Sequence, residues 1–275
     1  MIYKYSWDYN QKKQIVKVGN LNIGDKEIII AAGPCSVENE EQITETAKSV
    51  IKNGATVLRG GAFKPRTSPY SFQGLGLEGL ELLKKIKKQL NIPVVTELTD
   101  ISILNKYEEF VDIIQIGARN SQNFDMLKKL GIQKQPILLK NGLGTTVDEF
   151  LMSSEYILAN GNENVILCYR GTRSIENATR FSMDIGSISL VKKLSRLPIA
   201  VDPSHSAGKR EFVKPMALAA VVAGADMLEI EVHNDPENAL SDKEQQLTLE
   251  EFELLMIDLK NVAESIGRKI KLVKN

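Results

Sequence analysis

The chain alternates between two kinds of segment from residue 28 to residue 266. Short runs rich in β-branched and apolar residues lie at 28–33, 55–59, 92–96, 112–116, 136–140, 164–170, 198–201 and 226–233. The helical spacing of apolar residues predicts helices at 40–53, 76–90, 100–109, 123–130, 146–160, 184–194, 213–223 and 248–266. Strands that alternate with helices form a parallel sheet, and eight such units in a chain of this length predict a closed (β/α)8 TIM barrel.

The alternative architecture is a doubly wound open sheet, but no GxGxxG motif follows the first predicted strand.

Residues 14–23 alternate loosely around Gly19 and Asn20, which predicts a short β-hairpin before the barrel. We therefore expect a single catalytic domain over residues 1–275, in which residues 1–27 form the hairpin extension. Four glycines follow predicted helices, where a left-handed cap is expected: Gly54, Gly131, Gly161 and Gly224.

The charge balance excludes two classes of partner. The chain has 35 Lys and Arg residues against 35 Asp and Glu, so nothing global attracts nucleic acid or an acidic membrane surface. The N-terminal MIYKYSWDYN lacks the apolar core of a signal peptide, and the longest mostly apolar run is 216–225, well short of the roughly 20 residues that span a bilayer. The 2 cysteines do not make a disulfide framework. We expect a soluble, cytoplasmic protein.

Active-site side chains of a (β/α)8 barrel lie at the C-terminal ends of its strands and point inward. Cations occupy these positions or the loops that follow them in one half of the predicted barrel: Arg59, Lys64, Arg66, Arg119, Lys140 and Arg170. Arg forms paired charge-assisted hydrogen bonds with phosphate and carboxylate groups, and Lys acts as a compact charge. In a protein with zero net charge, this local excess predicts a small anionic substrate.

The segment RGGAFKPRTS at residues 59–68 concentrates these features. It adds the hydroxyls of Thr67 and Ser68 to its cations, and Pro65 restricts the loop. The glycines at 60–61 allow the backbone to approach a ligand closely. A solvated basic loop is the plain alternative, but this combination favours a binding site for phosphate or carboxylate oxygens.

The other half of the predicted mouth carries a mixed set of ligands for a metal ion. Cys35 ends the first strand, His205 follows the seventh and Glu231 ends the eighth, and these three strands become neighbours when the barrel closes. A thiol, an imidazole and a carboxylate suit a divalent transition metal. Asp242, in the loop after the eighth strand, is a fourth candidate ligand. His233 is either a further ligand or only a neighbour.

Cys168 and Glu229 are also expected to point into the barrel. Cys168 lies two residues below Arg170 on the same face, so we expect it in the inner core of the barrel. Glu229 shares the inward parity of Glu231 and must be paired or protonated there, but the sequence does not identify its partner.

Six cations and a Lewis-acid metal fit a reaction between two phosphorylated substrates. A Schiff-base aldolase that uses Lys140 stays open as an alternative.

Several separate motifs resemble one enzyme family in their order and spacing. They are GPCSVE at 33–38, RGGAFKPRTSPYSFQGLG at 59–76, QIGARNSQN at 115–123, LLKNG at 138–142, DPSHSAGKR at 202–210 and EVHNDPENALSD at 231–242. Together with the strand end at 170–171, they resemble the type I group of the 3-deoxy-D-arabino-heptulosonate-7-phosphate (DAHP) synthase family. The resemblance covers nearly the whole chain from residue 14 onward. It implies a transferase that condenses phosphoenolpyruvate with erythrose 4-phosphate at the start of the shikimate pathway to aromatic amino acids.

The resemblance also implies roles for individual residues. It assigns the metal to Cys35, His205, Glu231 and Asp242, and phosphoenolpyruvate to Arg59, Lys64, Arg119, Lys140 and Arg170. It assigns the phosphate of erythrose 4-phosphate to Arg66, Thr67 and Ser68. It places Lys64, Cys35, His205 and Asp202 in the catalytic set, with Asp202 near the hydroxyls of the aldose. The metal it implies is divalent, Mn²⁺ first, with Zn²⁺, Fe²⁺ and Co²⁺ as alternatives.

The related family of 3-deoxy-D-manno-octulosonate 8-phosphate synthases is the alternative function, with arabinose 5-phosphate as substrate. That family typically reads KANRSS where this chain reads KPRTS. A class II type aldolase and a metal-binding barrel without activity are more distant alternatives. The resemblance further implies a homotetramer or homodimer and allows a separate chorismate mutase as partner. The chain matches the short form of the family without an added regulatory domain, so we expect no feedback inhibition of this chain alone by aromatic amino acids.

Overall fold

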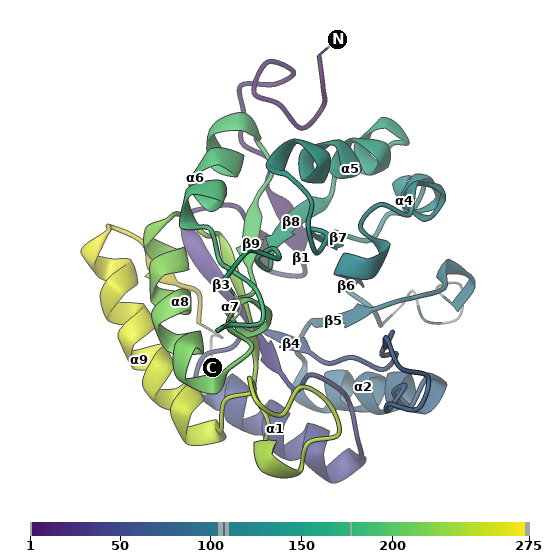
Figure 1. Ribbon diagram of the computed structural model, residues 1–275, viewed down its shortest axis with the longest axis vertical. Coiled ribbons are helices and arrows are strands. Elements are labelled where there is room, and N and C mark those ends of the chain that lie inside the picture. Colours follow the sequence, from purple (N-terminus) through teal and green to yellow (C-terminus); the bar gives the residue numbers. More distant parts are fainter. Residues whose placement is uncertain (1, 104–106, 108–109, 177, 273–275) are drawn as a thin grey trace.

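A ring of eight parallel strands surrounded by helices forms the body of the molecule (Figure 1). The computed structural model describes residues 2–103, 107, 110–176 and 178–272. The barrel strands are β3 (Glu27–Gly33), β4 (Val57–Arg59), β5 (Val94–Glu97), β6 (Ile113–Ile116), β7 (Ile137–Lys140), β8 (Val165–Tyr169), β9 (Ile199–Val201) and β10 (Met227–Glu231). Each pairs in parallel with the next, and β10 pairs with β3, which closes the barrel and confirms the predicted fold.

The main helices lie between successive strands on the outside of this ring (Figure 1). They are α1 (Glu40–Lys52), α2 (Leu77–Leu90), α4 (Phe124–Gly131), α5 (Val147–Ala159), α6 (Ile185–Leu194), α8 (Arg210–Val222) and α9 (Leu249–Ser265). In the helix expected at 100–109, the structure describes a 3₁₀ turn, Ile101–Ile103, and residues 104–106 and 108–109 lie outside the described residues. Of the helices described, none is long and apolar enough to cross a membrane.

A short α-helix and a short strand were not predicted from the sequence. Helix α7 (Pro203–Ala207) follows β9, and strand β11 (Lys269–Ile270) pairs in parallel with the beginning of β3. Gly131 was expected to cap α4 in a left-handed conformation, but it is the last residue of that helix and does not have a positive φ. A side chain there would come within 2.4 Å of the Cβ of Asn160, so this glycine permits close packing beside the end of α5.

The predicted N-terminal hairpin is present as β1 (Val16–Val18) and β2 (Leu21–Ile23). Its four apolar side chains are buried in one cluster with the first inward residue of each barrel strand, including Ile29 and Met227. The hairpin therefore closes the N-terminal end of the barrel. The opposite end, where the strands finish, is left for the charged side chains.

Truncation of the hairpin core should destabilise the barrel. Ile23 is fully buried, so Ile23→Ala is expected to lower the free energy of unfolding by about 2–5 kcal/mol, through lost apolar contacts and the cavity left behind. Urea denaturation measures this change. Ile132, at the end of α4, is 72% exposed, and Ile132→Ala should change the same free energy by no more than about 0.5 kcal/mol. Equal losses in the two variants would mean that the hairpin does not contribute to the core.

Candidate active site

The interior of the barrel changes from apolar to charged along the strands. Toward the N-terminal ends, inward residues such as Val57, Leu138 and Ala200 pack against the hairpin. Two residues further along the same strands, the inward side chains are Arg59 and Lys140, and in the residue after β9, Asp202. Such a group of buried charges is stable only when the charges are paired.

Glu229 supplies the pairing that the sequence analysis could not identify. Its Oε1 lies 3.4 Å from Nε of Arg59, and its Oε2 lies 2.9 Å from Nζ of Lys140. Glu231 Oε1 accepts a second hydrogen bond from Arg59, at 2.9 Å, and Asp202 Oδ2 accepts one from Lys140, at 2.6 Å. Two cations and three carboxylates thus form one continuous network across the floor of the site.

This network keeps Arg59, Lys140 and Asp202 ionised despite their burial. Burial opposes the charge on Arg59, but Glu231 and Glu229 raise its pKa above the ordinary value. Burial likewise opposes the charge on Lys140, and Asp202 and Glu229 raise its pKa. The carboxyl of Asp202 has a pKa well below its usual range, because His205 and Lys140 outweigh the effect of burial. The floor of the site therefore presents fixed charges.

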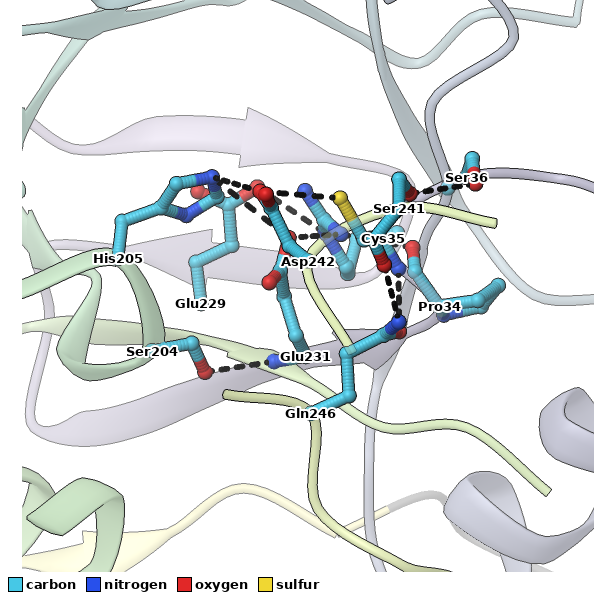
Figure 2. Close-up of polar contacts among 12 residues, drawn as sticks. Pro34, Cys35, Ser36, Ser204, His205, Glu229, Glu231, Ser241, Asp242 and Gln246 are labelled. Carbon is cyan, nitrogen blue, oxygen red and sulfur yellow. Dashed lines mark hydrogen bonds and ion pairs between the residues drawn. The ribbon is translucent and has the colours of Figure 1, made fainter. Parts of the chain in front are cut away.

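The four predicted metal ligands lie together at the rim of this network. One ligand atom each from Cys35, Glu231 and Asp242 lies within 4.8 Å of the others. His205 Nε2 is 3.7 Å from Glu231 Oε1 and 3.7 Å from Asp242 Oδ2. Figure 2 shows the imidazole, the thiol and the Asp242 carboxylate directed toward one another. Cys35, Glu231 and Asp242 form the compact group, and the imidazole nitrogen of His205 lies beside the two carboxylates. These donor types suit a divalent transition metal.

Local structure explains how each ligand reaches this point. Gly33 must be glycine, because a Cβ there would lie 2.1 Å from the carbonyl oxygen of Arg59. The chain can therefore turn beside β4 and place Cys35, whose backbone N–H donates to Oε1 of Gln246 at 2.8 Å. His205 lies in α7, where Asp202 caps the helix and holds a carboxylate oxygen 2.7 Å from Nδ1. That contact directs Nε2 toward the other ligands.

The Cys35 thiol is protonated at neutral pH in the absence of metal. Burial, and then the nearby Glu231 carboxylate, raises its pKa to about 12, although Lys64 Nζ lies 3.0 Å from the sulfur. A metal ion binds the thiolate, so binding must displace this proton. The affinity for metal should accordingly fall as the pH is lowered.

A cavity of about 420 Å³ opens beside the ligand cluster. Its walls include every substrate-binding residue predicted from the sequence: Arg59, Lys64, Arg66, Thr67, Ser68, Arg119, Lys140 and Arg170. His205 and Asp242 also line it. Cys35, Asp202 and Glu231 lie behind its surface, since each is at most 1% exposed. The structure thus brings all the predicted site residues to one place.

The guanidinium of Arg170 is held in place and has a donor that can bind an anion. Its guanidinium lies 3.7 Å from the centre of the Phe181 ring, and its backbone N–H donates to Asn141 Oδ1 at 2.7 Å. Burial lowers its pKa to about 10, so the group stays charged at neutral pH. NH1 is buried and has no hydrogen-bond partner among the described residues. A buried donor of this kind is satisfied when phosphate or carboxylate oxygens enter the cavity.

The sequence analysis missed several residues of the site. Arg173, Arg180, Glu97 and Gln115 line the cavity, and Gln245 and Gln246 contact ligand residues. Glu97 and Gln115 occupy the inward C-terminal positions of β5 and β6, so strand parity could have identified them. Arg173 and Arg180 lie in the irregular loop after β8, where no periodic signal exists. Glu97 is a carboxylate outside the ligand set, and its Oε2 accepts a hydrogen bond from Gln115 Nε2 at 3.5 Å.

The structure also shows whether His233 belongs to the ligand cluster. Its Nδ1 accepts a hydrogen bond from the Asp235 backbone at 2.9 Å, and its Nε2 lies 3.5 Å from Glu38 Oε2. The imidazole therefore faces Glu38, and His233 lies beside the predicted metal ligands and outside their cluster.

Comparison with known proteins shows to which family this chain belongs. The model of the DAHP synthetase I family matches residues 10–267. The chain belongs to the DAHP synthetase I family. Phospho-2-dehydro-3-deoxyheptonate aldolase of Thermotoga maritima is 48% identical over 265 residues, which are 96% of this chain and 78% of that protein. The crystal structure of a DAHP synthase from the same organism superposes with a TM-score of 0.94 at 46% identity, covering 98% of this chain and 80% of that one.

A second group of relatives of this DAHP synthetase I chain is more distant. The 2-dehydro-3-deoxyphosphooctonate aldolase of Geobacter sulfurreducens is 32% identical over 268 residues, which are 90% of this chain and 97% of that protein. The lower identity favours the heptulosonate reaction over the octulosonate alternative, in agreement with the KPRTS segment.

Proposed function

We propose that this chain condenses phosphoenolpyruvate with erythrose 4-phosphate to give DAHP and inorganic phosphate, and that Cys35, His205, Glu231 and Asp242 hold the divalent metal ion that the reaction needs. The observation that carries the proposal is a single cavity in which a cation-rich wall meets a mixed sulfur, nitrogen and carboxylate cluster. The cations suit two anionic substrates, and the cluster suits a Lewis acid.

The buried cations receive phosphoenolpyruvate. Arg59 and Lys140 are each 3% exposed and held in place by carboxylates, so they offer charge without reorganisation when the substrate binds. Arg170 adds its NH1, which has no partner in the part of the chain that the structure describes, and Arg119 and Lys64 complete the set on the cavity wall. Phosphoenolpyruvate has a carboxylate and a phosphate, which together require several such donors.

The phosphate of erythrose 4-phosphate binds at the mouth of the cavity. Thr67 and Ser68 are exposed, Arg66 is half-buried, and all three line the cavity. Arg119 NH2 donates to Thr67 Oγ1 at 3.4 Å, which ties the two substrate regions together. With its phosphate at the mouth, the aldose extends its aldehyde toward the ligand cluster.

The reaction joins C3 of phosphoenolpyruvate to the aldehyde carbon of the aldose. The metal, when bound, supplies Lewis acidity that polarises the aldehyde. As the new carbon–carbon bond forms, positive charge develops at C2, and water adds there. The bond between C2 and the phosphate oxygen then breaks and inorganic phosphate leaves. The cations of the cavity stabilise the phosphate and carboxylate charges throughout, and Asp202 lies where it orients His205.

Arg66 should determine how the aldose binds. Arg66→Ala is expected to raise the KM for erythrose 4-phosphate by at least about tenfold, because a charge-assisted hydrogen bond is worth about 1.5–3 kcal/mol. The KM for phosphoenolpyruvate, measured in the same variant, serves as the control and should change far less. Steady-state rates of phosphate release provide both values. A similar rise in both would contradict the assignment of Arg66 to the aldose.

The same assay distinguishes the two candidate reactions. The unmodified chain should use erythrose 4-phosphate at least about tenfold better than arabinose 5-phosphate in kcat/KM, a difference of about 1.4 kcal/mol. Equal turnover of the two sugars would overturn the proposal.

The identity of the metal ion, the oligomeric state and a partner protein can also be proposed. Mn²⁺ is the first candidate for the metal, followed by Zn²⁺, Fe²⁺ and Co²⁺. We further propose a cytoplasmic homotetramer or homodimer, with a separate chorismate mutase as a partner that would confer feedback control. Elemental analysis of the purified protein and measurement of its mass in solution test the first two points.

A further inference from the structure

Gln245 is a buried side chain with both of its polar atoms engaged. It is 1% exposed, and it follows the metal ligand Asp242 by three residues. Its Oε1 accepts a hydrogen bond from Arg180 NH1 at 3.1 Å. Its Nε2 donates to Glu231 Oε2 at 2.6 Å. Gln245 is not among the residues that line the cavity, so it acts through its neighbours.

The orientation of the Gln245 amide follows from the chemistry of its two partners. A guanidinium has only donors, so the amide oxygen must face Arg180. An ionised carboxylate has only acceptors, and Glu231 also accepts from Arg59 NH1, so the amide nitrogen must face Glu231. The reverse orientation would place two donors together and two acceptors together. The bridge therefore has one stable arrangement.

The bridge fixes the carboxylate plane of Glu231. Gln245 holds Oε2, whereas Oε1 accepts from Arg59 NH1 at 2.9 Å and faces His205 Nε2 at 3.7 Å. The Glu231 backbone N–H also donates to Ser204 Oγ at 2.9 Å, a contact visible in Figure 2. Side chain and backbone of this ligand are thus both held, with Oε1 directed at the imidazole.

The same bridge reaches a second ligand. Arg180 NH1, which donates to Gln245, also lies 3.2 Å from Asp242 Oδ1. In addition, the Gln245 backbone N–H donates to the Asp242 carbonyl oxygen at 3.2 Å. Asp242 has a φ of +44°, a conformation that a non-glycine residue keeps only when its surroundings hold it. Gln245 and Arg180 therefore link Glu231 at the end of β10 to Asp242 in the loop that follows.

We propose that Gln245, held by Arg180, is a positioning residue that sets the geometry of the Glu231 and Asp242 carboxylates and thereby the affinity of the site for a divalent metal ion. The inference rests on the proposed metal centre and adds a residue to it that contacts neither substrate nor metal. Carboxylates that bind metals are oriented by hydrogen bonds from neighbouring groups, and loss of such a group typically costs about 10–100-fold in metal affinity.

The test uses the full chain and Co²⁺ as the probe. Metal-free protein is titrated with Co²⁺ at 25 °C and neutral pH, and the thiolate-to-cobalt absorption band reports binding through Cys35 without any assay of activity. Gln245→Met replaces the amide by an apolar side chain of similar length and removes both hydrogen bonds. We expect its Kd for Co²⁺ to rise about 10–100-fold above that of the unmodified chain. Gln245→Asn should shift the Kd in the same direction, because its shorter amide no longer reaches Glu231.

A matched control separates this effect from general damage. Gln133 follows α4 and precedes the N-terminal end of β7, opposite the end of the barrel that carries the ligand cluster. Its amide donates to the Lys129 backbone carbonyl, and Gln133→Met should leave the Kd unchanged. Melting temperatures of the metal-free proteins provide the structural readout. A Gln245→Met variant that melts at a lower temperature but keeps a Kd within twofold would show a merely structural role and overturn the inference. If the unmodified chain itself gives no thiolate-to-cobalt band, the proposed metal centre and this inference both fail.

Discussion

Cys35→Ala should abolish turnover while the chain remains folded. Of the four proposed ligands, Cys35 supplies the thiolate, and its sulfur lies among the carboxylates of the cluster and 3.5 Å from Asp242 Oδ2. Without it, the site loses its strongest attraction for a thiophilic transition metal. Lewis-acid polarisation supplies several kcal/mol of transition-state stabilisation, so the rate should fall by about a thousandfold or more. Phosphate release from phosphoenolpyruvate and erythrose 4-phosphate, with Zn²⁺ or Co²⁺ added, measures this loss.

The second cysteine provides a matched control for this change. Cys168 is as fully buried as Cys35 but lies in the inner core of the barrel beneath the site, as expected from its position in β8. Cys168→Ala should therefore keep metal-dependent turnover, and circular dichroism should show that both variants are folded. Chelation by EDTA should mimic Cys35→Ala, and readdition of a divalent transition metal should reverse it. Full turnover by Cys35→Ala, or by protein shown to be metal-free, would contradict the proposed centre.

The fold was largely predictable because its signals are local. Each barrel strand is a short buried run, and each helix has an apolar stripe that faces the ring, so the alternation of patterns reveals the order of the elements. Strand β11, with two residues, and helix α7, with five, are too short to produce a periodic signal. Gly131 was misinterpreted because its role depends on the neighbouring residue Asn160, which only the packing of two helices brings near.

The site residues that could be predicted from the sequence are those at the ends of barrel strands. Arg59, Lys140 and Glu231 each end a barrel strand with the inward parity, so their convergence follows from closure of the barrel. Contacts across the barrel could not be derived in this way. Glu229 bridges β4 and β7, and which strands face each other across the interior depends on the tilt and stagger of the closed sheet. The Gln245 contact with Arg180 joins two loops, whose courses have no regular pattern.

Glu229→Gln should cause the largest loss of stability of any conservative change in the floor of the site. The Glu229 carboxylate is 1% exposed and is shared by Arg59 and Lys140, which are themselves buried. Glutamine has the same shape but no charge, so it would leave two buried cations with only Glu231 and Asp202 to balance them. Removal of one partner from a buried ion pair typically costs about 3–5 kcal/mol. The free energy of unfolding from urea denaturation should fall by this amount.

A surface ion pair with the same chemistry supplies the control for this last experiment. Glu40 Oε1 accepts a hydrogen bond from Lys85 Nζ on the surface, where the two side chains are 54% and 48% exposed. Water replaces the lost carboxylate there, so Glu40→Gln should cost at most about 1 kcal/mol. If Glu229→Gln cost no more than this control at an unchanged urea m-value, Arg59 and Lys140 would be adequately balanced without Glu229. In that case the continuous network would not be what keeps the cations of the cavity charged and in place.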